Sequence, residues 1–336
     1  MIRARKNIKI IFKYVLAPLL GAWLFYSLYK QIKGQPDLQQ SLYLIKEAPF
    51  GPQAWKFWVV IALVFVNWGF EARKWQVLVK TLQPFRFLTA YKSVLSGVTL
   101  SLNTPNRIGE YGGRILYVRE GNRIKAISLS IAGSISQLIV TLVMGCAGLV
   151  YIIYSNGSNA PQLIMGLPSF WINTLLFLSS CATVIVLLFY FRLSWLIKLV
   201  EKIPSASRVV QYISVLDDFN VKLLLRLLSL SFFRYVVFVI QYILLLQVLD
   251  VSILWVNGFG VISILFLVLA IVPSFEIADL GIRGKFSTEL LSFYSKNTVG
   301  IIGTTFGIWF INLFIPALAG SVLILSIKFL KTNNSD

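Results

Sequence analysis

Six apolar segments, each close to the length that crosses a lipid bilayer, take up most of the chain. They cover approximately residues 14–29, 55–70, 126–154, 170–191, 227–249 and 301–329. A helix needs about 20 apolar residues to cross the hydrocarbon core. Backbone amides and carbonyls find no water there, so only helices and closed barrels span membranes. The chain is 57% hydrophobic and 13% charged, whereas soluble domains are about 25% charged. The segments therefore predict an all-α polytopic membrane protein with six full spans.

The distribution of basic residues predicts the orientation. Lysines and arginines outnumber acidic residues, 31 − 13 = +18, and cytoplasmic loops carry the excess of lysine and arginine in membrane proteins. Five basic residues precede the first segment, and Lys328 and Lys331 end the last one. The loop 155–168 has no charged residue, as expected of a translocated loop. No small-residue cleavage site follows the first segment, so we interpret it as a span. Both termini are expected in the cytoplasm, and the protein in the cell membrane.

Two further apolar runs are too short to span and are followed by polar turns. Leu95 to Leu102 leads into 104–114, and Gly258 to Val272 leads into 273–285. Both polar stretches combine proline, glycine, arginine and acidic residues. Charges and irregular backbone at membrane depth are tolerated where they line a cavity or are buried in protein. We interpret both runs as re-entrant elements, although the first also fits a cytoplasmic loop with an ordinary turn.

One re-entrant element then enters from each side, as in an inverted-topology repeat. We expect a single membrane domain, 1–336. Its first half is 1–154 with a re-entrant element over 89–124, and its second half is 227–336 with one over 256–294. Residues 155–226 join them through one span and an amphipathic helix along the cytoplasmic face, over about 204–226. A short interfacial helix is expected within 34–54.

The two halves carry similar charged residues. An acid and an arginine four residues apart meet on one helix face, which predicts self-neutralised pairs such as Glu110–Arg114 and Asp279–Arg283. Arginine side chains suit bidentate contacts with phosphate. The candidate substrate-binding residues are Arg73, Arg107, Glu110, Arg114, Arg234, Glu276, Asp279 and Arg283.

These residues resemble a known family. The pattern Pro105, Arg107, Gly109-Glu110 and Arg114, together with Pro273, Leu280-Gly281-Ile282-Arg283 and the Arg73-Lys74-Trp75 end of the second span, is similar to the membrane portion of bacterial lysylphosphatidylglycerol synthases. That flippase-like family also includes stand-alone membrane proteins. The resemblance covers nearly the whole chain and implies lipid translocation. No counterpart of the aminoacyl-transferring domain follows, so lipid aminoacylation is not implied. This chain has Glu276-Ile277-Ala278-Asp279 where the family tends to be glycine-rich, and Gly284-Lys285 where an acid would fall, so no particular lipid is carried over.

Three functions fit the sequence. The first is a flippase that moves an anionic or phosphate-linked lipid headgroup through an arginine- and glutamate-lined cavity. The second is a scaffold subunit for a membrane enzyme, and the third is an intramembrane enzyme acting on a lipid phosphate. The chain contains no histidine, which is the commonest metal ligand and general base. Cys146 and Cys181 both lie in apolar segments. We therefore expect no enzyme activity, no metal, no cofactor and no nucleic-acid partner.

Overall fold

The structure is a computed structural model that describes residues 38–102, 104, 107–156, 166, 168–192, 214–216, 219–272 and 276–332. Every element in these ranges is a helix. The expected span over 14–29 lies outside them. The elements are α3 (Leu38–Glu47), α4 (Ala54–Val79), α5 (Phe87–Leu102), α6 (Gly109–Ile115), η3 (Glu120–Asn122), α7 (Arg123–Asn156), α9 (Ser169–Phe191), η5 (Ser214–Leu216), α12 (Val221–Val248), α13 (Trp255–Ile271), α14 (Glu276–Leu291), α15 (Thr298–Trp309), η6 (Phe310–Phe314) and α16 (Ile315–Thr332).

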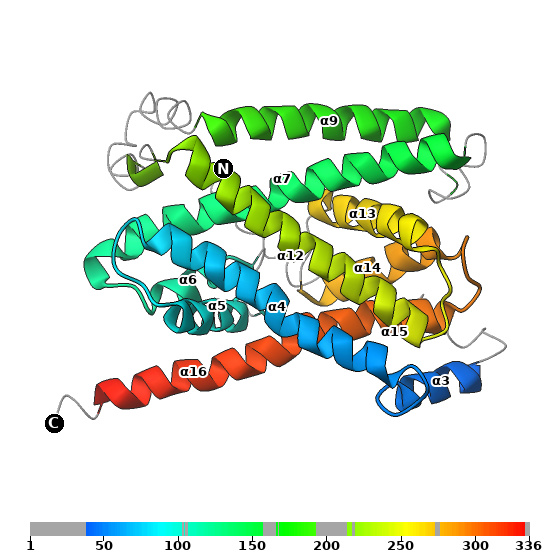
Figure 1. Ribbon diagram of the computed structural model, residues 1–336, viewed down its shortest axis with the longest axis horizontal. Coiled ribbons are helices and arrows are strands. Elements are labelled where there is room, and N and C mark those ends of the chain that lie inside the picture. Colours follow the sequence, from blue (N-terminus) through cyan, green and yellow to red (C-terminus); the bar gives the residue numbers. More distant parts are fainter. Residues whose placement is uncertain are drawn as a thin grey trace, which may run out of the picture.

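Five helical segments of the described chain are long and apolar enough to cross a membrane: 54–79, 120–155, 169–191, 221–248 and 298–326. In Figure 1 they run along the long axis of the molecule, some of them obliquely, and alternate in direction. The C-terminal ends of α4 and α16 lie at the same end of the molecule. The fold is thus the all-helical, multi-pass architecture that the apolar segments predict. The short helix expected within 34–54 is present as α3.

Helices α5 and α6 form a tight antiparallel hairpin. The Ser93 hydroxyl donates to the carbonyl of Arg114 at 2.8 Å, which pairs the start of α5 with the end of α6. Glycine makes the close approach possible. A Cβ on Gly113 would lie 2.3 Å from the Ser96 carbonyl oxygen, and one on Gly109 would lie 2.1 Å from that of Leu100. This hairpin occupies the segment that was expected to enter and leave on one side, 89–124.

A second hairpin is formed by α13 and α14. Ile282 on α14 packs against Leu269 and Val272 near the end of α13. In Figure 1 this pair lies toward the opposite end of the long axis from α5 and α6. The sequence predicted a polar turn over 273–285, but α14 already begins at Glu276. That part of the expectation was therefore wrong.

Two other expected boundaries also differ. The second span was expected to end at Phe70, yet α4 continues through Glu71 to Val79, because its polar residues find partners inside the protein. Most of the amphipathic helix expected over 204–226 lies outside the described residues. Its last part belongs instead to α12, which begins at Val221 and is capped by the Asn220 side chain, 2.8 Å from the amide of Leu223.

The last span is interrupted by the π-helical turn η6. Pro316 lies two residues after its end and cannot donate to the carbonyl of Asn312, four residues earlier. That carbonyl instead accepts a hydrogen bond from the indole nitrogen of Trp68 at 3.1 Å. Such π turns often mark functional positions, and Asn312 lies beside the cavity described below.

Candidate functional site

A buried ion network joins α4, α6 and α12, with Glu71 at its centre. Glu71 Oε1 accepts a hydrogen bond from Arg114 at 2.8 Å. Its Oε2 lies 2.9 Å from Lys74 Nζ and 3.2 Å from Arg234 NH1. Glu71 is 4% exposed, Lys74 1% and Arg114 2%. One carboxylate therefore contacts three cations that come from three helices.

The pair expected between Glu110 and Arg114 is present one turn apart on α6. Arg114 thus bridges two carboxylates, and its guanidinium lies over the ring of Trp75, 5.6 Å from the centroid. Trp75 is itself fixed by a 2.8 Å hydrogen bond to Ser93 on α5. Through these contacts the buried side chain of Arg114 links α4 to the α5–α6 hairpin.

The polar first half of α7 supplies further partners. Ser130 accepts a contact from Arg114 at 3.4 Å, Gln137 accepts one from Arg234 at 3.3 Å, and Ser136 contacts Ser231 at 2.9 Å. These three side chains of α7 therefore bond to neighbouring helices.

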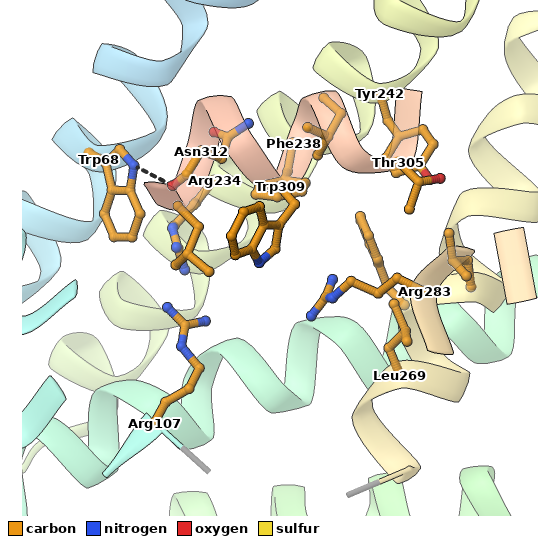
Figure 2. A pocket seen from close by; sticks show the side chains of 14 residues that line it. Trp68, Arg107, Arg234, Phe238, Tyr242, Leu269, Arg283, Thr305, Trp309 and Asn312 are labelled. Carbon is orange, nitrogen blue, oxygen red and sulfur yellow. Dashed lines mark hydrogen bonds between the residues drawn. The ribbon is translucent and has the colours of Figure 1, made fainter. Parts of the chain in front are cut away.

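Beside the network lies a cavity of about 80 Å³, which has room for several water molecules. Three arginines line it: Arg107 next to the start of α6, Arg234 on α12 and Arg283 on α14. Figure 2 shows their guanidinium groups pointing into the same space around Trp309. The remaining lining residues are mostly aromatic, aliphatic or amide: Trp68, Phe238, Tyr242, Leu265, Phe266, Leu269, Thr305, Ile308, Trp309, Asn312 and Leu313. None of the described lining residues is acidic.

The backbone at Arg107 is unusual. Its φ is 57°, in the left-handed region that non-glycine residues rarely adopt. Such a conformation costs about 1–3 kcal/mol and is found preferentially at binding sites and switch regions. Here it belongs to the turn between α5 and α6, from which the side chain extends toward the cavity (Figure 2).

The structure places most of the predicted site residues in the cavity or in the buried network. Arg107, Arg234 and Arg283 line the cavity, Glu110 and Arg114 lie in the network, and Arg234 also contacts Glu71 there. Arg73 belongs to neither group. It is exposed and donates to Gln76 on its own helix. Glu276 and Asp279 lie in the first turns of α14, but their side chains are outside the described residues, so the pair expected between Asp279 and Arg283 stays a prediction.

Several residues of the site were not predicted. Glu71 and Lys74 are three residues apart, so they lie on one helix face, and Arg73 does not lie on that face. The spacing of this acid and lysine is the sequence pattern that could have predicted the pair. Asn67 and Asn312 are single amides in apolar segments, which is also a detectable signal. Trp68 and Trp309 had none, because aromatic residues are frequent throughout the chain.

Comparison with known proteins gives no assignment. No protein-family model matches the chain, and no curated protein matches it.

Proposed function

We propose that this protein moves a lipid with an anionic, phosphate-bearing headgroup across the cell membrane. The observation that carries the proposal is the convergence of three arginines from separate helical elements on one cavity. An unpaired phosphate in hydrocarbon is prohibitively costly, so a translocation path needs fixed donors. Guanidinium groups supply them in a planar fork that matches phosphate oxygens.

The arrangement of the hairpins supports the same proposal. Arg107 comes from the α5–α6 hairpin and Arg283 from the α13–α14 hairpin, so residues of both hairpins line the cavity. Transporters built from inverted repeats bind their substrates near the bilayer midplane at such a place. We infer that both hairpins are re-entrant, with the C-terminal end of α16 in the cytoplasm. The resemblance to the flippase-like family favours a lipid as the substrate.

The first prediction concerns binding at the cavity. Arg107→Gln and Arg283→Gln should each weaken binding of short-chain phosphatidic acid to the purified protein about tenfold, since each removes a charge-assisted contact. Arg283→Lys should also weaken binding, because lysine keeps the charge but loses the planar fork. Titration calorimetry in an uncharged detergent measures the affinity.

Arg73→Gln is the matched control. It removes an exposed arginine that contacts Gln76 and does not line the cavity, so binding should stay at the wild-type level. Equal loss of affinity in Arg73→Gln and Arg107→Gln would contradict the proposal, because general surface charge would then explain binding.

A further inference from the structure

Arg234 is held at two of its three guanidinium nitrogens. Its Nε donates to Asn67 Oδ1 at 2.9 Å, and its NH1 contacts Glu71 and Gln137 at 3.2 and 3.3 Å. The ring of Trp68 covers its face, with 5.2 Å between the guanidinium carbon and the centroid. Within the described chain, NH2 has no hydrogen-bond or ion-pair partner. This nitrogen is therefore the one left for a ligand in the cavity that Arg234 lines.

Asn67 is fully buried and its amide orientation is determined by its neighbours. Arginine has donors only, so the oxygen of Asn67 must face Arg234. The amide nitrogen then faces two oxygens, Gln241 Oε1 at 3.4 Å and Asn312 Oδ1 at 3.3 Å. Gln241 is fixed in turn by a 2.9 Å bond to the carbonyl of Val60. Asn67 thus ties α4, α12 and the π turn together around Arg234.

The identity of residue 67 matters because an amide is uncharged whereas a carboxylate is negative. Glu71 already contacts Arg234, Arg114 and Lys74. A second carboxylate at position 67 would orient Arg234 equally well but would cancel more of its charge. An amide directs the guanidinium without neutralising it.

We propose that Asn67 is a positioning residue of the anion site, orienting Arg234 so that NH2 faces the cavity while its charge stays available to a phosphate. This inference rests on the proposed function. Asn67 itself touches no ligand in this arrangement and acts through Arg234.

The test uses the purified full chain and two measurements. One is hydrogen exchange of the Arg234 Nε–H, followed by NMR and assigned by its disappearance in Arg234→Lys. The other is the affinity for short-chain phosphatidic acid. Asn67→Leu should make the exchange fast and weaken binding about tenfold. Asn67→Asp should keep the exchange slow but also weaken binding, because it adds negative charge beside Arg234.

Gln241→Leu is the control for a purely structural role. It breaks the contacts to Asn67 and Val60 but none to Arg234, so it should lower the thermal stability and leave exchange and affinity unchanged. The inference is overturned if Gln241→Leu weakens binding as much as Asn67→Leu does. It is also overturned if either Asn67 variant keeps wild-type affinity. Asn67→Asp retains the hydrogen-bond acceptor, so it remains informative if Asn67→Leu does not fold. Fast exchange of the Arg234 Nε–H in Asn67→Asp would likewise overturn the inference. If the wild type does not bind phosphatidic acid but the exchange pattern is as expected, the proposed function is overturned, whereas the contact by which Asn67 orients Arg234 is established.

Discussion

Glu71→Gln should almost eliminate folded protein. Glu71 is buried and contacts Lys74, Arg114 and Arg234, so glutamine would leave three cations with only Glu110 to balance them. Leaving one buried charge without its partner destabilises by about 3–5 kcal/mol, and folded proteins are stable by only about 5–15 kcal/mol in total. Size-exclusion chromatography of the solubilised protein, followed by thermal unfolding, measures the loss.

Glu120→Gln provides the comparison at the surface. Glu120 pairs with Arg123 at 3.1 Å, but its side chain is 79% exposed, and such pairs contribute little to stability. Glu120→Gln should therefore give the same amount of folded protein and the same thermal unfolding as the wild type. Adding Lys74→Met to Glu71→Gln should recover part of the folded protein, since it removes one of the stranded cations. If Glu71→Gln and Glu120→Gln are equally stable, the network does not hold the helices together.

The second large effect is expected at the hairpin. Gly113→Ala should strongly destabilise the protein, because its Cβ would lie 2.3 Å from the Ser96 carbonyl oxygen and 2.5 Å from Gly97 Cα. Both are backbone atoms, so α5 and α6 must move apart. That shift would displace Arg114 from its contacts with Glu71 and Ser130. The midpoint of thermal unfolding and the yield of monodisperse protein report the effect.

The neighbouring glycine is the matched control. A Cβ on Gly112 would meet only the end of the Leu100 side chain, at 3.9 Å. Alanine is favoured over glycine inside a helix by about 1 kcal/mol, so Gly112→Ala should be neutral or stabilising. Similar unfolding midpoints for the two alanine variants would show that α5 and α6 are not packed as closely as described.

The five helical segments in the described ranges that are long and apolar enough to cross a membrane were predictable from sequence, because each depends on a local property, the length of an apolar run. Helix α4 shows the limit of that rule. Its apolar run ends at Phe70, yet the helix continues to Val79, since Glu71 pairs with Arg114 and Arg234 from distant parts of the chain and Lys74 pairs with Glu71. Likewise, the start of α14 was missed because the polar residues after Pro273 resemble a turn in sequence.

The site was predicted in part for a similar reason. Arginines in apolar surroundings indicated Arg107, Arg234 and Arg283, and the four-residue spacing indicated the Glu110–Arg114 pair, which is confirmed. What the sequence did not indicate is which charges are grouped. Arg114 faces Glu71, which is 43 residues away, and Asn67 meets Asn312 across 245 residues. Such pairings depend on how the helices pack, so they emerge only from the three-dimensional structure.

The most direct test of the central claim is translocation in reconstituted vesicles. The full chain would be placed in phosphatidylcholine vesicles that carry a trace of fluorescent phosphatidylglycerol, and an impermeant reductant would destroy the outer-leaflet label. We predict that the wild type and Arg73→Gln make the inner-leaflet label accessible, whereas the double variant Arg107→Gln with Arg283→Gln falls to the rate of protein-free vesicles. Equal rates for the wild type and the double variant would contradict the arginine cavity as the path of the headgroup.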